Sequence, residues 1–485
     1  MTRHHDHDVI IIGAGLSALQ AARTLLSRAQ VDVVLLEARN RIGGRALTDY
    51  SHSHSGVAVD LGCSMIHGYY EGNPARDLVS DLGIDVHIPS SDDPNGLVLA
   101  RDGPLTRADA TSLFAASTQM AFRPEPKTHK TQSVAAALFP TLVAKDERLV
   151  AIARTAEVGA GIPLELTSAK WTGFEQGVHG TDAFPDGGYS RVVDRLAEEV
   201  QANGGRIRLD TPVVAVEDLG PDGGGIRVTT RDGETRTARR VLSTIPLSVL
   251  QKSPPRFTPS LSPAFLAAAR RTVVGNLEKV VLTYPHAWWP NPTAHGSYLL
   301  LPVATDPAPA PDSLERLFEQ TTIPVVNFCR IAKSPHPTLL AYLGATAAVH
   351  LAKYSPEEIS TALDAYLVRR LVPGTTTTTT RTRTVPEPVH TAVTTWHSDP
   401  YSQGATSSPT TVASTDDDED EEATPLDFIT LSRPEWDARL LFAGEHTDLD
   451  NHGSVAGALI SGKREADRIR CLLEAEDRLR QANST

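Results

Sequence analysis

The sequence predicts an α/β fold with a Rossmann-like dinucleotide-binding domain and a second domain. The first observation is the stretch 8–45, which reads as a strand, a tight glycine turn, a helix, a second strand and an acidic residue. The second is length, because 485 residues are too many for one ordinary core. The third is composition: 40% hydrophobic residues and a mean hydropathy of -0.20 are typical of a globular enzyme.

The opening strand and turn carry the dinucleotide prediction. Residues 9–12 form a continuous apolar run, as expected of a buried parallel strand. Gly13 permits a tight turn, and Gly15 lets the backbone approach a pyrophosphate at the N-terminus of the next helix. We place Leu16 and Ser17, which open that helix, at the same site. Glu37 closes the second strand, 31–36, about 20 residues after the glycines, where a carboxylate binds the ribose hydroxyls of an adenosine.

A second glycine motif indicates which dinucleotide is bound. Arg41, Gly43, Gly44 and Arg45 form an R-x-G-G-R run soon after Glu37, which adds backbone amides and positive charge for a pyrophosphate. A soluble nicotinamide enzyme does not need this clamp, whereas a permanently held flavin does. These residues resemble the FAD site of the flavin-containing amine oxidases, the family of monoamine and polyamine oxidases. The resemblance is densest over residues 8–75, 184–290 and 394–470.

The resemblance implies how the two domains share the chain. A Rossmann-like FAD-binding domain is expected from three discontinuous segments, 1–77, 186–262 and 394–472, the last with an acidic loop at 405–424. A substrate-binding domain of mixed sheet and helices is expected from residues 78–185 and 263–393, and a C-terminal tail from 473–485. Within these segments the patterns predict helices over 190–202 and 356–371, strands over 206–209, 226–230, 240–246 and 440–443, and a strand followed by a turn over 339–352.

Two segments resemble the family's active-site motifs. The stretch 60–74 resembles a motif of the fungal-type polyamine oxidases in which a histidine lies over the active site. His67 matches that histidine, and we assign the neighbouring Met65 and Ile66 to the cofactor site. The alternative is that His67 is a structural histidine. Lys279 matches the lysine that holds a water against the flavin N5 atom, and a surface lysine on an edge strand is the alternative.

Val213 is expected near the adenine, or else is a plain core valine.

The last segment returns to the flavin. By resemblance, Trp396 packs beside the isoalloxazine, and Gly444 and Glu445 meet the ribityl chain and pyrophosphate. A helix expected from residue 453 presents its free N–H groups, including that of Val455, to the flavin, and its dipole stabilises negative charge there. Ser454 is also assigned to this site.

The family pattern breaks at two positions. Many amine oxidases enclose the amine between two tyrosines, and here Thr406 and Ser454 occupy those positions. We assign both to the substrate site and take Tyr401, Trp171 and Trp289 as candidate replacements for the aromatic cage. Monoamine oxidases attach FAD through a cysteine where this chain has Ala405, so non-covalent FAD is expected.

Charge and cysteine usage restrict partners and compartment. The net charge is -13, to which the acidic run 416–422 contributes seven, and no basic patch suggests nucleic acid. No apolar run approaches the length of a membrane span. Three cysteines, widely spaced, argue for a reducing compartment and against a disulfide framework or a metal site. We expect a cytoplasmic monomer or homodimer.

The predicted activity is FAD-dependent oxidation of a polyamine such as spermine, spermidine or an acetylated form. The amine passes a hydride to flavin N5, the imine is hydrolysed, and O2 reoxidises the flavin to give hydrogen peroxide. Asp182 or Glu175 could bind the distal ammonium groups of this cationic substrate. Three alternatives stay open: a flavin oxidase of another amine or an amino acid, a lysine demethylase, and a catalytically inactive flavoprotein that serves as a binding module.

Overall fold

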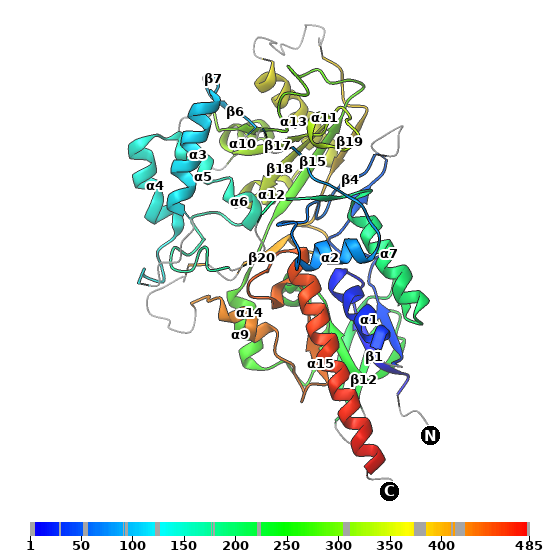
Figure 1. Cartoon of the computed structure of the whole chain (residues 1–485). Coiled ribbons are helices and arrows are strands. Elements are labelled where there is room, and N and C mark those ends of the chain that lie inside the picture. Colours follow the sequence, from blue (N-terminus) through cyan, green and yellow to red (C-terminus); the bar gives the residue numbers. More distant parts are fainter. Residues whose placement is uncertain are drawn as a thin grey trace.

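The structure is a computed structural model that describes residues 5–28, 31–51, 57–90, 92, 96–121, 127–175, 177, 180–220, 225–303, 311–372, 385–408, 411–412 and 422–482. Two sheets organise these residues, one in each half of the molecule, and the first strand lies in the same half as the last helix (Figure 1).

The first sheet has eight strands, and its centre is the parallel part that the opening motif predicts. Its order is β13 (Arg256–Thr258), β10 (Val213–Asp218), β11 (Ile226–Thr230), β12 (Thr235–Ser243), β1 (His7–Ile12), β2 (Val33–Leu36) and β9 (Arg206–Arg208), with β21 (Leu440–Phe442) also paired to β12. β1 is parallel to both neighbours, with Ile10 opposite Val34 on one side and Val241 on the other. All three side chains are buried, as in a sheet covered on both faces.

Helices cover both faces of this sheet. On one face α1 (Leu16–Arg28), α2 (Pro74–Asp81), α7 (Gly188–Ala202) and α15 (Val455–Ala482) share an apolar core with the strands. On the other face lie α8 (Leu247–Lys252), α9 (Pro263–Arg271) and α14 (Leu426–Leu431). Figure 1 shows α15 (red) beside α1 (blue). Their approach is close because Gly462 has no side chain: a Cβ there would lie 2.2 Å from the carbonyl oxygen of Ser17.

The second sheet has seven strands and is antiparallel except between β16 and β6. Its order is β19 (His390–Val393), β15 (Leu277–Thr283), β18 (Thr338–Gly344), β17 (Ile323–Asn327), β16 (Ser297–Leu300), β6 (Leu97–Ala100) and β7 (Gly103–Pro104). α10 (Leu314–Gln320), α12 (Ala345–Leu351) and α13 (Pro356–Leu371) share one core with it. α3 (Arg107–Ala121), α4 (Val134–Lys145) and α5 (Arg148–Ala153) form a second core against β6 and β16.

Several short elements lie outside the two main sheets. Three pairs of strands lie outside the main sheets: β3 (Thr48–Asp49) with β4 (Val59–Asp60), β5 (Val86–His87) with β8 (Phe184–Pro185), and β14 (Val273–Gly275) with β20 (Thr406–Ser408). α6 (Ala156–Ala160), α11 (Phe328–Ile331) and the 3-10 helix η2 (Glu445–Thr447) complete the described elements. No helix in the described ranges combines the length and apolar character needed to cross a bilayer.

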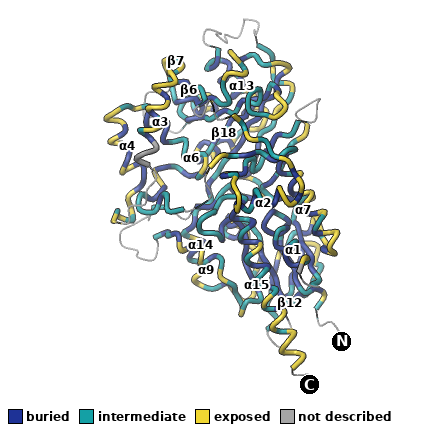
Figure 2. The backbone as a smooth tube through the Cα atoms, viewed as in Figure 1, coloured by how far each residue is buried: buried dark blue, intermediate teal, exposed yellow. Residues whose placement is uncertain are grey.

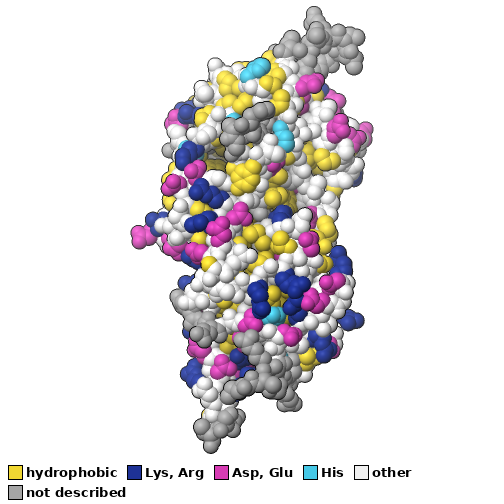
Figure 3. All heavy atoms as spheres, turned by 90° about the vertical axis from the view of Figure 1, so that its right-hand side faces the viewer, with side chains coloured by type: hydrophobic (Ala, Val, Ile, Leu, Met, Phe, Trp, Pro, Cys, Tyr) yellow, Lys and Arg dark blue, Asp and Glu magenta, His cyan; other side chains and the backbone are white. Residues whose placement is uncertain are grey.

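Burial follows the two sheets, and the surface carries side chains of both charges. Figure 2 shows the strands of both sheets as the buried part of the chain and the C-terminal end of α15 as exposed. On the face seen in Figure 3, a group of Lys and Arg side chains in the lower half is bordered by Asp and Glu side chains. Acidic and basic groups are therefore interspersed on this face.

One predicted helix is confirmed at its bounds, the strand predicted over 240–246 is part of β12 and ends at Ser243, and three stretches form another kind of element than expected. α13 spans 356–371 as predicted and begins with a capping box between Ser355 and Glu358. Residues 345–351, expected as a turn, form α12, because Ala347 and Leu351 bury against the second sheet. Residues 406–408, expected within a loop, form β20 by pairing with β14.

The third difference is at the C-terminus. Residues 473–482, expected as a tail, continue α15, where Glu474 pairs with Arg470 one turn earlier at 3.1 Å and Glu476 pairs with Arg239 at 2.9 Å. Most of the acidic run, residues 416–421, and the last residues, 483–485, lie outside the described part. The domain boundaries at 77, 185, 262, 393 and 472 stay predictions.

α6 packs backbone to backbone on the ends of β15 and β18. A Cβ at Gly344 would lie 2.7 Å from the carbonyl oxygen of Glu157, and one at Gly161, where φ is +70°, would lie 2.6 Å from the amide nitrogen of Asn276. This approach leaves no room for a side chain at Gly344, and it fixes the position of α6.

Substituting Gly344→Ala therefore tests the packing of α6. The added methyl group meets backbone, so we expect the free energy of unfolding to fall by about 1–3 kcal/mol. Gly159→Ala is the matched control, because a Cβ there meets nothing within 4 Å, and we expect a change within about 1 kcal/mol. Denaturant unfolding of both variants measures the difference, and equal losses would contradict the close packing.

Candidate active site

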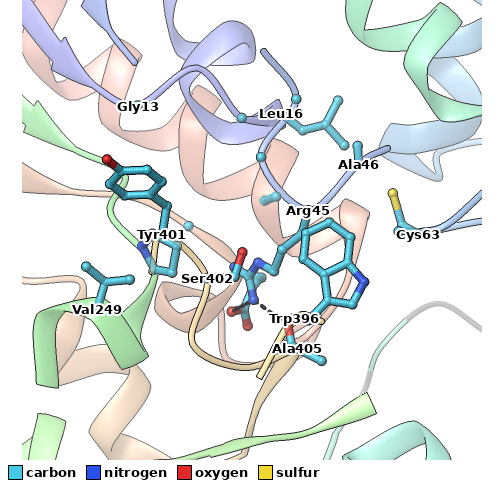
Figure 4. Close-up of a pocket in the computed structure, with 18 of the residues that line it drawn as sticks. Gly13, Leu16, Arg45, Ala46, Cys63, Val249, Trp396, Tyr401, Ser402 and Ala405 are labelled. Carbon is cyan, nitrogen blue, oxygen red and sulfur yellow. Dashed lines mark hydrogen bonds and ion pairs between the residues drawn. The ribbon is translucent and has the colours of Figure 1, made fainter. Parts of the chain in front are cut away.

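One cavity of about 890 Å³ is lined by residues of both sheets. The lining comes from stretches far apart in the sequence, within 12–67, 155–159, 212–255, 277–342 and 396–458. Figure 4 shows Tyr401 and Val249 towards the side of Gly13, Trp396 and Cys63 on the other side, and Arg45 between them. The cavity thus joins the glycine turn of the first sheet to strands β15, β17 and β18 of the second.

Two glycine turns form a cradle on the first side. Gly13 has a φ of +107°, and its Cβ would lie 2.5 Å from Oγ1 of Thr244. Gly15 forms a bridge with Gly43, whose N–H donates to the carbonyl of Ala14 at 2.8 Å. A Cβ at Gly15 would meet the chain only at 3.9 Å, so it would project into the cavity that Gly15 lines. The missing side chain therefore leaves backbone exposed to a ligand.

The first turn of α1 completes this cradle. Leu16 and Ser17 both line the cavity and begin the helix, so their N–H groups have no partner within the helix. A helix N-terminus with open N–H groups next to glycine backbone favours an anion such as a pyrophosphate.

Glu37 follows β2 at the edge of the cradle. Its Oε2 accepts the N–H of Ala14 at 2.8 Å and its Oε1 accepts that of Arg39 at 2.9 Å. Burial raises the pKa of Glu37, although these two hydrogen bonds act in the opposite direction. The carboxylate is thereby held rigidly on the cavity wall, with Val213 lining the same cavity.

The partly exposed Arg45 and the buried Glu445 form an ion pair beside the cradle. Arg45 donates to Glu445 at 2.9 Å and to the carbonyl of Ala405 at 2.5 Å. Glu445 also accepts from the hydroxyl of Ser407 at 2.5 Å and the N–H of Gly453 at 2.9 Å. Burial alone would raise the pKa of Glu445, but the positive charges of Arg45 and His446 and these hydrogen bonds lower it to about 2. Glu445 is therefore ionised and fixes the guanidinium of Arg45.

Lys279 lies on the other side of the cavity, on β15. Its ammonium donates three hydrogen bonds, to the carbonyl of Asp60 at 2.8 Å, the carbonyl of Gly62 at 2.6 Å and the hydroxyl of Ser64 at 2.6 Å. The side chain is 4% exposed, which rules out the surface-lysine alternative. Burial lowers the pKa of Lys279 to about 8, although the negative charge of Asp60 opposes this shift. A water-binding role for Lys279 remains a prediction.

Two groups near Lys279 were missed by sequence reasoning. Tyr342 on β18 is the direct strand partner of Lys279, lines the cavity, and has its ring centre 5.4 Å from the lysine Nζ. Burial raises the pKa of Tyr342 to about 12. The carboxylate of Asp60 accepts from the hydroxyl of Thr48 at 2.6 Å and the N–H of Tyr189 at 2.9 Å, and burial raises its pKa to about 6. The alternation of β18 alone could not show that Tyr342 lies opposite Lys279.

His67 lines the same cavity at a more exposed position. Its Nδ1 lies 3.2 Å from Oδ2 of Asp182, and the side chains are 55% and 39% exposed. The side-chain amide of Asn73 donates to the carbonyl of His67 at 2.7 Å and fixes the loop. The structure thus brings His67, Asp182 and Lys279 to one cavity or its edge. Glu175 is placed elsewhere, with its carboxylate 3.0 Å from Nε2 of His452.

The candidates for an aromatic cage are dispersed. Tyr401 lines the cavity on the side of the glycine turn, where the Arg39 guanidinium lies 5.4 Å from its ring centre. Trp171 donates to Glu422 at 3.1 Å and Trp289 is buried in the core of the second sheet, so neither belongs to the described lining. Trp396 does line it, with its indole N–H on the carbonyl of Leu61 at 3.1 Å.

The two positions that replace the cage tyrosines also line the cavity, and their hydroxyls are engaged with the backbone. Thr406 donates to the carbonyl of Ala160 at 3.2 Å. Ser454 donates to the carbonyl of Asn451 at 2.6 Å and accepts the N–H of Gly457 at 3.1 Å, so it caps α15, which begins at Val455.

The predicted site residues converge, with one exception. The cavity lining contains Gly13, Gly15, Leu16, Ser17, Glu37, Arg45, Met65, His67, Val213, Lys279, Trp396, Thr406, Gly444, Glu445, Ser454 and Val455. Ile66 is not in this lining, because its side chain is buried in the core of the first sheet and its backbone pairs with Ala183. In an extended segment neighbouring side chains point in opposite directions, which separates Ile66 from Met65 and His67.

These residues fit a flavin dinucleotide. The glycine cradle and α1 suit the pyrophosphate, Glu37 suits the ribose, and Arg45 adds positive charge held in place by Glu445. Lys279 and Trp396 line the part of the cavity that belongs to the second sheet.

Comparison with known proteins agrees with this fit. A family model described as flavin containing amine oxidoreductase matches residues 14–470. "Polyamine oxidase 4" of Oryza sativa subsp. japonica is 27% identical over 494 residues, which cover 95% of this chain and 88% of that protein. "Polyamine oxidase 3" of the same plant is 26% identical over 515 residues, with 99% and 92% covered.

A second group of relatives carries another name. "Lysine-specific histone demethylase 2" of Homo sapiens is 27% identical over 490 residues, which cover 96% of this chain and 54% of that protein. The chain spans about half the length, or less, of the demethylases that it matches.

The low pKa of Lys279 makes stability depend on pH. Between pH 8 and 10.5 the unfolded chain holds a proton that the folded chain has released, so the free energy of unfolding rises with pH in this window. Lys279→Met removes this rise. We therefore expect the difference in free energy of unfolding between the wild type and the variant to increase by roughly 3 kcal/mol, in favour of the wild type, from pH 8 to pH 10.5. Unfolding titrations at several pH values measure the difference. Lys353→Met, at an exposed position, is the control, and a flat difference for Lys279→Met would contradict the burial of its ammonium.

Proposed function

The chain belongs to the flavin-containing amine oxidoreductase family, and on this premise we propose that it oxidises polyamines with FAD and O2. One observation carries the proposal: Lys279 and His67 line a single cavity that also contains the dinucleotide cradle. An amine placed between them would lie beside the cofactor and near a carboxylate, Asp182, at the exposed edge.

The cofactor is bound by the chain's own groups. When bound, FAD supplies a hydride acceptor: it takes a hydride from the α-carbon of an amine and passes the electrons to O2, which gives hydrogen peroxide. Water then hydrolyses the imine product.

We propose that the attachment is non-covalent. Ala405 carries no nucleophile, and burial raises the pKa of the Cys63 thiol, so the cysteine in the lining stays protonated.

The exposed edge of the cavity favours a cationic substrate. The carboxylate of Asp182 lies next to His67 at this edge, and both side chains contact solvent. A polyamine could place one amine at Lys279 and extend its remaining ammonium groups towards Asp182. Glu175 is held by His452, so the proposal assigns the distal ammonium to Asp182 alone.

A second candidate substrate is an N-methylated lysine in a peptide. Demethylases align with 96% of this chain at 27% identity, as much as the polyamine oxidases do. The reaction class would be unchanged, because an N-methyl carbon also lies next to the amine nitrogen.

The cysteines support a reducing compartment such as the cytoplasm. Cys63, Cys329 and Cys471 are free thiols, and Cys471 is exposed.

Anaerobic mixing of the FAD-loaded protein with candidate amines tests the function. We expect spermine or N-acetylspermine to bleach the flavin absorbance faster than benzylamine, leucine or a dimethyl-lysine peptide. Bleaching by the peptide alone would transfer the assignment to demethylation. The absence of bleaching with every amine would contradict the oxidase and favour a binding module.

Glu37→Ala tests the dinucleotide assignment. Loss of a charged hydrogen-bond acceptor costs about 1.5–3 kcal/mol, so we expect the Kd for FAD to rise roughly tenfold to hundredfold. The ratio of FAD to protein after gel filtration measures retention, with Glu357→Ala on exposed α13 as control. Full occupancy in Glu37→Ala would refute the ribose assignment.

A further inference from the structure

The three groups that bind the ammonium of Lys279 are chemically unequal. The carbonyl oxygens of Asp60 and Gly62 can only accept hydrogen bonds, whereas the hydroxyl of Ser64 can both accept and donate. When Lys279 is an ammonium, all three of its hydrogens are used. When it is neutral, its two hydrogens can stay on the carbonyls, and its lone pair can accept the hydrogen of Ser64. Only the bond to Ser64 can therefore reverse.

Ser64 is also the group that connects Lys279 with the cavity. Both residues line it, but the lysine Nζ is surrounded by its three acceptors and is 2.6 Å from the Ser64 oxygen. Tyr342 lies on the same wall of the cavity. A proton that travels from the cavity to Lys279 by hydrogen bonds has a hydroxyl path through Ser64.

We propose that Ser64 is a catalytic residue that passes the proton of the substrate ammonium to Lys279. This proposal rests on the proposed amine oxidase function and names the group that prepares its substrate. A neutral amine is the form that can lose a hydride from its α-carbon, so the ammonium must first lose a proton.

The step balances without any other reactant. The N–H bond of the substrate ammonium breaks as its proton bonds to the Ser64 oxygen, and the Ser64 O–H bond breaks as that hydrogen bonds to the neutral Lys279 nitrogen. The products are a neutral amine, an unchanged serine and a lysine ammonium held by three acceptors. The two backbone carbonyls keep the nitrogen in place throughout.

The charged and titratable groups around Lys279 allow this transfer. The carboxylate of Asp60 acts on it from the β4 side, where the thiol of Cys63 is protonated, and Tyr342 faces it from β18. Glu278, its neighbour on β15, is bound by Thr394 and by the N–H of His397. Asp60 is the group that stabilises the ammonium product, while burial keeps the pKa of Lys279 near 8, so that a neutral fraction exists at physiological pH.

Pre-steady-state bleaching by spermine between pH 6 and 10 tests the relay. The wild type should approach a plateau above about pH 8, whereas Ser64→Ala should be about 10²-fold slower at pH 8 and rise without that plateau. Ser64→Thr, which keeps a hydroxyl, should restore the plateau, and Ser64→Gly repeats the test if the alanine variant does not fold. Ser360→Ala, a buried serine on α13, is the matched control.

Two outcomes would overturn the proposal. A Ser64→Ala profile with the wild-type plateau and rate would show that protons bypass Ser64. A plateau lost in Tyr342→Phe but kept in Ser64→Ala would assign the relay to Tyr342 and also overturn it.

A measurement without substrate separates the relay from the proposed function. Ser64→Ala removes one acceptor from the Lys279 ammonium. The pH at which Lys279 titrates, measured from the pH dependence of the free energy of unfolding, should therefore fall by about one unit. An unmoved midpoint overturns the proposal. If no amine bleaches even the wild type, the oxidase function fails, and a shifted midpoint still establishes the coupling of Ser64 to Lys279.

Discussion

The structure depends on a buried ammonium that one half of the molecule supplies and the other half binds. Lys279 belongs to the second sheet, whereas its acceptors Asp60, Gly62 and Ser64 lie at the end of β4 and in the loop that follows it. Moving a charge out of water is costly unless hydrogen bonds replace its hydration, so the ammonium and its acceptors must stay together. This constraint fixes the loop against β15 and places Met65 and His67 on the wall of the cavity.

Backbone approaches make the opposite wall equally rigid. Gly15 bridges to Gly43, and Gly462 of α15 meets the backbone of Ser17, so three stretches far apart in sequence meet at the start of α1. The pair of Arg45 and Glu445 then connects this wall with β20 through Ser407. A cavity with both walls held in this way can keep a flavin and an amine in a fixed relation, which is the main contribution of a protein to cofactor chemistry.

Relatives with two kinds of names resemble this chain to a similar degree. Both groups align over nearly all of it at 26–28% identity. His67 lines the exposed edge of the cavity and Tyr342 lines its wall, while Thr406 and Ser454 occupy the positions expected for the cage tyrosines. The hydroxyls of Thr406 and Ser454 are bound to backbone, so these residues shape the cavity more than they offer hydrogen bonds.

The sequence by itself determined the elements whose signal is local. The opening strand, the glycine turn, Glu37 after β2 and the helix 356–371 follow from periodicity, turn chemistry and caps, which act over a few residues. Only the tertiary structure decided that Tyr342 faces Lys279, that Ile66 enters the core while its neighbours line the cavity, and that residues 345–351 are helical. The acceptors of Lys279 lie more than 200 residues away along the chain. Contacts of this kind depend on how two sheets pack, and no local pattern encodes that packing.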